Sequence, residues 1–324
     1  MKEKFTEENE NVKRAEEMLF LNVAGIDFKN PVLVSSGTFG FGFEYSDYFD
    51  PSNLGGLVTK GITLTPRKGN PPPRLCETPA GLLNSIGLEN PGVESFIEKY
   101  LPMIKKRFDT NIIVNIADNT PEKYAEIARK LDQEKNSIAA LEINISCPNV
   151  KEGGMAFGSN PDIAYELVKA VKKETTLPVI TKLSPNVTDP VEIAVAVEEA
   201  GSDVISLINT VQGMGIDIYN ETPVLANVFG GLSGPAVKPI GVRMVWQVAE
   251  KVKVPLIGMG GIMDYTDALE YILAGASLVS IGTGNFTDPK TGVRIINDLI
   301  NHVDQHECTS IVELIGRGRN SNSS

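Results

Sequence analysis

Short apolar runs rich in β-branched residues recur along the chain, and stretches with helical periodicity separate most of them. Eight such runs occupy residues 31–35, 56–60, 111–116, 141–146, 178–183, 204–208, 254–259 and 277–281. Helical patterns occupy residues 94–107, 121–135, 161–174, 190–200, 236–250 and 265–274. Continuous apolar strands that alternate with helices are typical of a parallel sheet covered by helices. Eight units in 324 residues predict an α/β fold of the (β/α)8 TIM-barrel type, with an open doubly wound sheet as the alternative.

Proline marks several of the predicted helix entries. Pro121, Pro161 and Pro190 each begin a helical pattern, where the missing N–H of proline costs nothing. A last helix is expected after Asp288, with Pro289 in the same entry position.

Two insertions lengthen the predicted barrel. Residues 63–94 are rich in Pro and Gly, and residues 210–235 are rich in Gly and Asn. Long segments without regular structure are usually lids or binding loops, so we expect both over the C-terminal face of the barrel. The expected organisation is a charged N-terminal arm (1–20), the barrel (21–315) and a polar, frayed tail (316–324).

Composition excludes several classes of function. A net charge of −11 argues against a nucleic-acid surface, and no apolar run reaches the roughly 18 residues of a membrane span. The three cysteines, Cys76, Cys147 and Cys308, form no CxxC pair, so neither zinc nor an iron–sulfur cluster is expected on them. An odd, low cysteine count favours a cytoplasmic protein. His302 and His306 have metal-binding spacing, but a solvated helix face is the favoured interpretation and no metal is predicted.

Every predicted strand ends in a polar or glycine cluster. The clusters hold Ser36, Lys60, Asn115, Asn144 with Cys147, Lys182, Asn209 with Thr210, Gly260-Gly261, and Gly282-Thr283-Gly284. Lysine is rarely buried without a partner, so two strand-end lysines indicate an anionic or electron-rich ligand. Glycine loops after strands seven and eight are typical of phosphate sites in barrels, although each alone is also explained by a tight turn. Together they predict a phosphorylated cofactor.

Cys147 is the candidate catalytic residue. It stands between two asparagines in Asn144-Ile-Ser-Cys-Pro-Asn149, directly after an apolar strand. A buried structural thiol is the alternative, because free cysteine is often buried. The two histidines lie near the C-terminus, so a general base in the main body must be Cys, Lys, Asp, Glu or Tyr, which favours Cys147.

The order and spacing of five motifs resemble the dihydroorotate dehydrogenase family over about residues 21–315. The motifs are Asn84-Ser-Ile-Gly-Leu-Glu-Asn90, Asn144-Ile-Ser-Cys-Pro-Asn149, Thr181-Lys-Leu-Ser-Pro-Asn186, Gly230-Gly-Leu-Ser-Gly-Pro235 and Gly258-Met-Gly-Gly261. A cysteine as base resembles the soluble class 1, and the stretches 209–217, 223–227 and 230–239 look most like class 1B. That class implies FMN on this chain, and NAD⁺ reached through a second subunit that carries FAD and a [2Fe–2S] cluster. It further implies a homodimer of this chain within a heterotetramer.

The resemblance also implies a role for each site residue. Cys147 would take a proton from ring carbon 5 of (S)-dihydroorotate while a hydride leaves carbon 6 for N5 of FMN, giving orotate in pyrimidine (UMP) biosynthesis. The substrate would be bound by Lys60, Asn84, Ser85, Ile86, Gly87, Leu88, Asn144, Asn209 and Thr210. FMN would be surrounded by Ser36, Lys60, Gly61, Asn115, Asn144, Lys182, Ile208, Gly234, Gly260, Gly261, Gly282 and Thr283. Lys182 would lie near the N1–C2 carbonyl edge of the flavin, and Gly153-Gly154 could let the loop of Cys147 hinge.

Other functions share parts of this pattern. A class 1A homodimer would reduce fumarate instead, and a dihydropyrimidine dehydrogenase-like barrel would act on uracil. Lys60 and the segment 84–90 favour a carboxylated ring over uracil. A tRNA dihydrouridine synthase would need an RNA-binding surface, which the acidic charge opposes. A catalytically silent scaffold is disfavoured by the intact set of Cys147, the two lysines and the asparagines.

Overall fold

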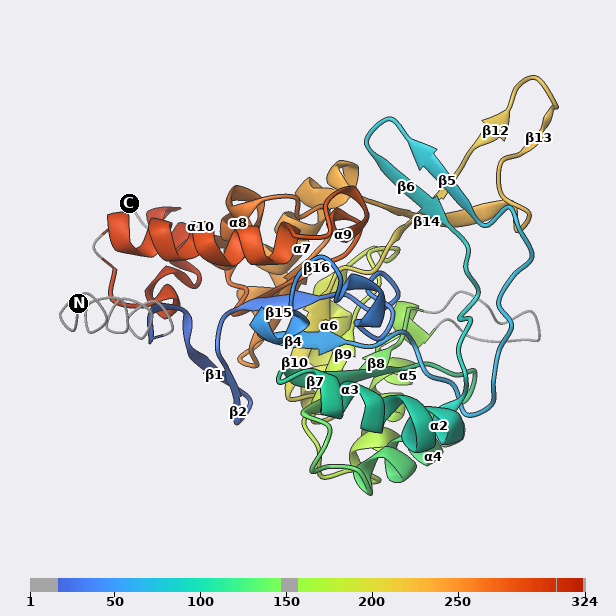
Figure 1. The fold of residues 1–324 in the computed structure, drawn as a ribbon, viewed down its shortest axis with the longest axis horizontal. Helices are drawn as coiled ribbons and strands as arrows, with labels where there is room; N and C mark the ends of the chain where they lie inside the picture. Colours follow the sequence, from blue (N-terminus) through green and yellow to red (C-terminus); the bar gives the residue numbers. More distant parts are fainter. Residues whose placement is uncertain (1–16, 147–156, 307, 323–324) are drawn as a thin grey trace.

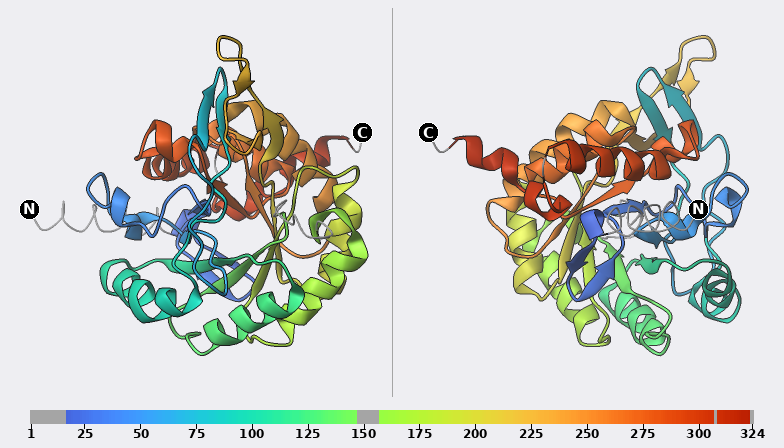
Figure 2. Two further views of the ribbon diagram at one scale, coloured as in Figure 1. Left: turned by 90° about the vertical axis from the view of Figure 1, so that its right-hand side faces the viewer. Right: turned by 60° about the vertical axis from the view of Figure 1, so that its left-hand side comes forward.

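The fold is a closed parallel β-barrel surrounded by helices (Figures 1 and 2). The computed structural model describes residues 17–146, 157–306 and 308–322. The barrel strands are β3 (Val32–Val34), β4 (Gly56–Val58), β7 (Asn111–Ile116), β8 (Ala140–Asn144), β9 (Val179–Lys182), β10 (Val204–Leu207), β15 (Leu256–Met259) and β16 (Leu278–Ile281). They pair in parallel and close between β16 and β3. All eight predicted strands are confirmed, and closure excludes the open sheet.

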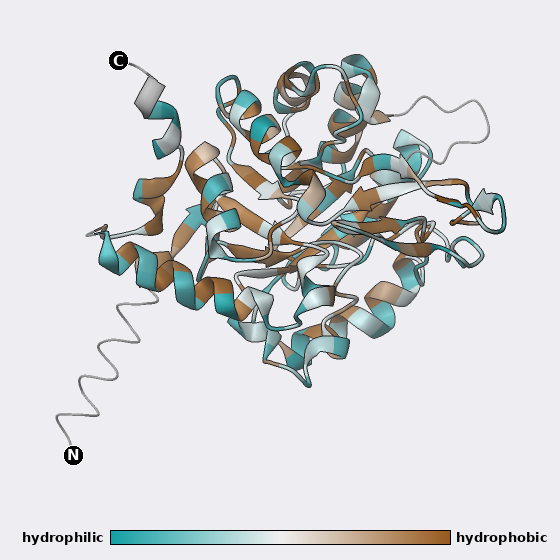
Figure 3. Cartoon of the chain, turned by 90° about the horizontal axis from the view of Figure 1, so that it is seen from above, coloured by the Kyte–Doolittle hydropathy of each residue, from teal (hydrophilic) through white to brown (hydrophobic). Residues whose placement is uncertain are grey.

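Helices follow most of the strands and cover the outside of the barrel. They are α2 (Val93–Ser95), continued by the π-helix η3 (Phe96–Tyr100) and α3 (Leu101–Arg107), then α4 (Pro121–Asp132), α5 (Pro161–Lys172), α6 (Pro190–Glu199), α7 (Lys238–Ala249), α8 (Tyr265–Ala274), α9 (Gly284–Thr287) and α10 (Thr291–Gln305). Figure 3 shows brown, apolar residues gathered in the central strands and teal residues on the outward sides of the helices.

The predicted helix starts at Pro121, Pro161 and Pro190 are confirmed. A polar side chain caps each one: Thr120, Asn160 and Asp189 accept hydrogen bonds from backbone N–H groups of the first turn.

The prediction for Pro289 is wrong, because α10 begins two residues later, at Thr291. Asp288 follows the last residue of α9, and its carbonyl accepts hydrogen bonds from the backbone N–H and hydroxyl of Thr291. Pro289 therefore lies in a turn between two helices.

A short hairpin closes the N-terminal end of the barrel. Strands β1 (Leu21–Val23) and β2 (Ile26–Phe28) pair in antiparallel register. Their buried side chains Leu21, Val23 and Phe28 form one cluster with the lower interior residues of the strands. These interior residues are Leu33, Val58, Ile113, Ala140, Ile180, Val204, Ile257 and Leu278. The lower half of the barrel is therefore an ordinary apolar core.

The next interior layer of the barrel is polar. Side chains on a strand alternate between its faces, so two residues further along each strand points inward again. Those positions are Ser35, Lys60, Asn115, Glu142, Lys182, Ser206, Met259 and Ser280. Only Met259 in this layer is apolar. The change from an apolar to a polar layer places charge and hydrogen-bonding groups at the C-terminal face.

The two insertions join in one antiparallel sheet rather than forming separate loops. Strands β5 (Leu75–Thr78) and β6 (Gly81–Asn84) from the first pair with β14 (Phe229–Ser233) and β11 (Val211–Met214) from the second, in the order β11-β14-β6-β5. A small hairpin of β12 (Ile216–Asp217) and β13 (Thr222–Pro223) projects beyond this sheet (Figure 1). The expectation that these insertions lack regular structure is wrong, because both contain strands. The sequence does not reveal this sheet, since the strands that pair across the two insertions lie far apart along the chain.

Both ends of the described chain pack on the barrel domain. Met18 and Leu19, inside the expected N-terminal arm, are buried. In the expected tail, the 3-10 helix η7 (Arg317–Asn322) follows Gly316, whose N–H donates to the carbonyl of Ile272. Arg319 donates to the carbonyl of Ala249 at 2.7 Å. Among the residues that the structure describes, no helix is long and apolar enough to cross a membrane.

Candidate active site

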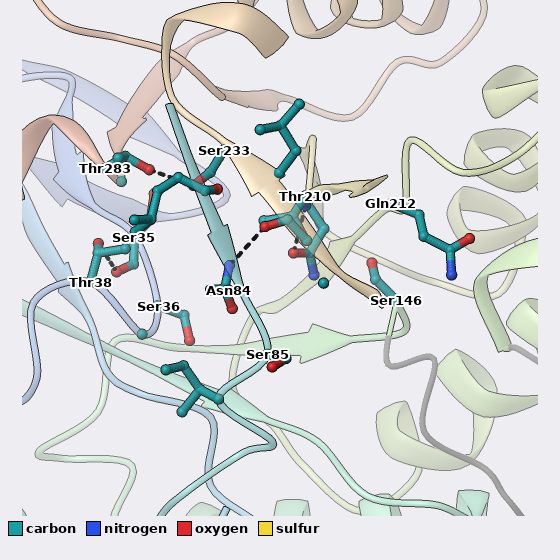
Figure 4. Close-up of a pocket in the computed structure, with 18 of the residues that line it drawn as sticks. Ser35, Ser36, Thr38, Asn84, Ser85, Ser146, Thr210, Gln212, Ser233 and Thr283 are labelled. Carbon is teal, nitrogen blue, oxygen red and sulfur yellow. Dashed lines mark hydrogen bonds between the residues drawn. The ribbon is translucent and has the colours of Figure 1, made fainter. Parts of the chain in front are cut away.

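A cavity of about 1130 Å³ lies at the C-terminal ends of the barrel strands, beneath the inserted sheet (Figure 4). Every described residue that the sequence assigned to substrate or cofactor lines this cavity, with the exception of Asn115. Cys147, the proposed base, and the glycine pair 153–154 lie outside the described residues. Ser146, the last described residue before Cys147, lines the cavity.

Two asparagines join the ends of β8 and β10 at the cavity wall, on either side of β9. The Asn209 side-chain amide donates to Asn144 Oδ1 at 3.2 Å, and Asn144 Oδ1 also accepts from the backbone N–H of Ser146. The Tyr124 hydroxyl donates to the carbonyl of Asn144 at 2.7 Å, from helix α4 outside the barrel. The Ser146 hydroxyl donates to the carbonyl of Lys182 at 3.3 Å. The segment that leads into Cys147 is therefore held at the cavity by bonds on both sides.

Lys182 is one of the two lysines that line the cavity within the described part of the chain, and it is 5% exposed. Its ammonium lies 3.8 Å from the carboxylate of Glu142, which is 1% exposed. Glu142 accepts hydrogen bonds from Asn115 Nδ2 at 2.6 Å and from the Ser206 hydroxyl at 2.9 Å. Asn115 therefore lies under the cavity wall rather than on it, and its place around FMN stays a prediction.

Lys60 lines the cavity two residues after the end of β4 and is more exposed than Lys182. The residue after it, Gly61, lies directly over Asn115: a Cβ added there would be 3.0 Å from Asn115 Oδ1 and 3.2 Å from Leu88 Cδ2. Glycine at 61 thus keeps the cavity floor open next to a buried carbonyl oxygen.

The glycines at the rim divide into two kinds. Gly234, Gly260 and Gly261 have positive φ angles of 96°, 121° and 73°, so the backbone itself favours glycine there. Tyr271 supports this rim, because its hydroxyl donates to the carbonyl of Gly260 at 2.7 Å. Burial raises the pKa of Tyr271, which keeps the hydroxyl protonated.

Gly282 is different, because its φ is not in the positive region and a Cβ there would have no neighbour closer than 3.8 Å. Nothing in the fold of the described residues requires glycine at 282. The added methyl group would instead occupy space at the cavity wall.

The inserted sheet roofs the cavity. Asn84, at the end of β6, donates to the carbonyl of Gly231 on β14 at 3.2 Å. Thr283, after β16, donates to the Ser233 hydroxyl at 2.7 Å, and Figure 4 shows the two side chains turned toward each other. Asn90 is the last residue of the motif at residues 84–90 and does not line the cavity. It is buried and hydrogen-bonded to Thr63 and to the carbonyl of Leu88.

Several cavity residues were not predicted from the sequence. They include Ser35, Thr38, Asn70, Arg74, Ser184, Asn186, Gln212, Phe229, Ser233 and Phe286. Ser35 lies two residues beyond an inward-facing apolar residue on its strand, and so do Glu142 and Ser206 beneath the cavity. The alternation of side chains along a strand could therefore have identified all three from the sequence. Residues of the inserted sheet carried no comparable signal.

No group of three or more His, Cys, Asp or Glu side chains in the described part of the chain could hold a metal ion. His302 and His306 stack at 4.0 Å between ring centroids, and His306 Nδ1 lies 2.9 Å from the carbonyl of His302. Burial, followed by the nearby His306, lowers the pKa of His302. His302 lies on α10 and His306 follows its last residue, and neither lines the cavity.

A family model described as dihydroorotate dehydrogenase matches residues 18–303. The chain belongs to the dihydroorotate dehydrogenase family. Curated relatives named "Dihydroorotate dehydrogenase B (NAD(+)), catalytic subunit" include that of Desulforamulus reducens, 56% identical over 298 residues, which are 92% of this chain and 97% of the relative. Those of Geotalea uraniireducens and Citrifermentans bemidjiense are 52% and 53% identical, over 92% and 91% of this chain and 97% and 96% of the relatives. The predicted family is therefore confirmed, and with it an oxidoreductase built on a (β/α)8 barrel.

Proposed function

We propose that this chain is the catalytic subunit of an enzyme that oxidises (S)-dihydroorotate to orotate in pyrimidine biosynthesis, with FMN as its cofactor. The electrons would pass to NAD⁺ through a partner subunit that carries FAD and a [2Fe–2S] cluster. The observation that carries the proposal is the cavity, because it gathers at one barrel mouth the predicted substrate and cofactor residues from strands distant in sequence. The NAD⁺ acceptor and the partner rest on the names of the relatives, which are NAD(+)-linked catalytic subunits.

The residues present suit a phosphorylated, planar cofactor. The cavity is large enough for a ligand of this size, and two lysines provide positive charge on its wall. Asn115 Oδ1 is buried without a hydrogen-bond partner, and an unpaired buried acceptor is costly, so a ligand N–H donor above Gly61 would satisfy it. Gly282 leaves space where no backbone constraint demands it. FMN, when bound, would supply the hydride acceptor that no protein side chain offers.

The protein side chains would then bind and orient the substrate. Lys60 would attract the carboxylate of dihydroorotate, while Asn84, Asn144 and Asn209 offer amide donors and acceptors to the ring. The Asn209–Asn144 hydrogen bond fixes how these two amides face the cavity. The positions 85–88 and Thr210 complete the wall on the side of the inserted sheet.

Cys147 would act as the base on this chain. A thiol has an unperturbed pKa of about 8.5, so a fraction is thiolate near neutral pH and can take a proton from carbon 5. This role rests on the sequence. The residue before Cys147, Ser146, supports it, because Ser146 lines the cavity and is bonded to Asn144 and Lys182.

A visible spectrum under anaerobic conditions tests the proposal. The purified chain should show a flavin spectrum, and adding dihydroorotate should bleach it. A flavin that remains oxidised would contradict the substrate, and uracil-type substrates would be tried next. Oxidation of the reduced flavin by fumarate, without a partner, would contradict the NAD⁺-linked assembly and favour the class 1A alternative. Absence of flavin, even after FMN is added back, would contradict the proposal as a whole.

A further inference from the structure

The polar layer of the barrel contains a carboxylate that the proposed chemistry does not use. Glu142 lies on β8 between Leu141 and Ile143, and it is 1% exposed. It does not line the cavity: in the strand register it pairs with Ile180, two residues before Lys182, which does line the cavity. The carboxylate of Glu142 lies 3.8 Å from the ammonium of Lys182, so the two form an ion pair but are too far apart for a hydrogen bond.

Packing alone does not call for a charge at this position. Met259, which takes the corresponding position on β15, is apolar and buried, so a charge is not found at every such position of the barrel. Removing a carboxylate from water is costly, and well-packed apolar residues often replace buried ion pairs without loss of stability. A charge kept here is therefore better explained by what it does to its neighbours.

The first neighbour is Lys182. A negative charge 3.8 Å beneath its ammonium lowers the positive potential that Lys182 presents to the cavity. Because both groups are nearly inaccessible, water screens this effect little.

The second neighbour is Asn115. Glu142, when ionised, can only accept hydrogen bonds, so the 2.6 Å contact must be made by the NH₂ group of Asn115. The carbonyl oxygen of the same amide then faces Gly61, where it lacks a partner. The hydrogen bond to Glu142 thus orients the Asn115 amide so that its carbonyl oxygen, an acceptor, is the group nearest the cavity floor.

We propose that Glu142 is a positioning residue that sets the reduction potential of the bound flavin, by tempering the charge of Lys182 and by fixing the orientation of Asn115. The inference rests on the proposed function, because it requires FMN in the cavity. Positive charge beside a flavin stabilises its reduced, anionic form, so tempering that charge holds the potential down. Glu142 would thereby keep the reduced flavin a good electron donor to the partner subunit.

The test is the midpoint potential of FMN bound to Glu142→Gln, measured by anaerobic spectrophotometric titration with a reference dye. Glutamine keeps the shape of the side chain and removes the charge. We expect a more positive potential than in the wild-type chain, equivalent to reduced FMN gaining affinity relative to oxidised FMN by on the order of ten-fold. A role in stability alone would change the unfolding midpoint and leave the potential where it was.

Two further variants make the result specific. Thr181→Val removes a buried hydrogen bond to Ser202 from the strand that carries Lys182, without changing any charge, and its potential should equal that of the wild type. Glu142→Asp keeps the charge but withdraws it by one methylene, so its potential should shift in the same positive direction by less. If Glu142→Gln does not fold, the Glu142→Asp shift alone decides.

Each outcome is decisive. A positive shift in Glu142→Gln, an intermediate value in Glu142→Asp and none in Thr181→Val would support the inference. An unchanged or more negative potential in the Glu142 variants, or an equal shift in Thr181→Val, would overturn it. FMN that binds but is not reduced by dihydroorotate would contradict only the proposed substrate, since dithionite reduces the flavin for the titration. A wild-type chain that binds no FMN would overturn both.

Discussion

The Thr283 hydroxyl donates to the Ser233 hydroxyl at 2.7 Å, and this bond joins the barrel rim to the sheet that roofs the cavity. Thr283 follows strand β16, and Ser233 ends strand β14 of the inserted sheet. Both side chains line the cavity, so the bond has two possible uses: it holds the roof, or it orients Thr283 toward a ligand.

Comparing Thr283→Val with Ser233→Ala separates these uses. Each variant removes the same hydrogen bond, which contributes about 1 kcal/mol to stability. If Thr283 also binds FMN, as proposed, Thr283→Val should lose clearly more flavin than Ser233→Ala. The measurement is the ratio of flavin to protein after gel filtration, together with the dissociation constant for added FMN. Equal losses would assign Thr283 to the roof alone.

Cys147→Ala tests the proposed base. We expect the variant to keep FMN while the rate of flavin reduction by dihydroorotate falls by about 10²–10⁴-fold, the usual contribution of a general base. Stopped-flow absorbance under anaerobic conditions measures that rate. Cys147→Ser should retain part of the activity, with more at high pH, because a hydroxyl is a weaker acid than a thiol. Unchanged reduction in Cys147→Ala would exclude Cys147 as the base.

Phe28→Ala should destabilise the protein without affecting the site. Phe28 is 1% exposed in the cluster that fills the N-terminal end of the barrel, opposite the cavity. Removing a buried phenyl ring costs about 3–5 kcal/mol in the free energy of unfolding. Urea unfolding measures this, and the flavin content of the folded variant should match that of the wild type. Ile26→Ala on the same hairpin is the control, with a smaller loss because Ile26 is only partly buried.

The barrel and most of the cavity wall could be predicted from the sequence because both depend on short-range patterns. A buried parallel strand is a continuous apolar run, and the residue at its end, such as Lys60 or Lys182, follows directly in the sequence. Glu142 belongs to the same pattern, since a charge inside an apolar strand is visible without a structure.

The roof could not be predicted in the same way. Strand β6 pairs with β14 through partners such as Asn84 and Gly231, which lie far apart in the chain. The glycine-rich residues of β14 carry little strand propensity, and their pairing is decided by tertiary contacts. A Cβ at Gly231 would lie 2.0 Å from Thr210 Oγ1, so glycine there reflects close packing in the roof rather than a flexible loop.

Asp132→Asn should reduce stability in a pH-dependent way. Burial alone would raise the pKa of Asp132, but hydrogen bonds from the Thr176 N–H and from the hydroxyls of Thr175 and Thr176 outweigh it and lower the pKa. A carboxyl with a lowered folded-state pKa stabilises the protein above its unfolded value of about 3.9, and that stabilisation is lost as the pH falls through the folded value. We expect Asp132→Asn to cost about 1 kcal/mol at pH 7.

Urea unfolding of both proteins between pH 7 and pH 3 measures this effect. The difference between wild type and Asp132→Asn should shrink below about pH 4, because the wild-type carboxyl is then increasingly protonated. A difference that stays constant across this range would show that the charge of Asp132 contributes nothing.

Gly282→Ala distinguishes a ligand-binding glycine from a structural one. The added methyl group has no protein atom closer than 3.8 Å, from Ser35 Oγ, and no positive φ opposes it. We therefore expect the folded protein to be as stable as the wild type or slightly more so, since alanine restricts the unfolded chain. The methyl group would stand in the cavity wall, so FMN should bind at least several-fold more weakly.

Gly261→Ala is the matched contrast: its φ is 73° and its Cβ would lie 2.8 Å from the carbonyl oxygen of Gly234, so it should lose stability even without ligand. Normal FMN affinity in Gly282→Ala, measured by fluorescence titration, would show that the cofactor does not approach the backbone at this position.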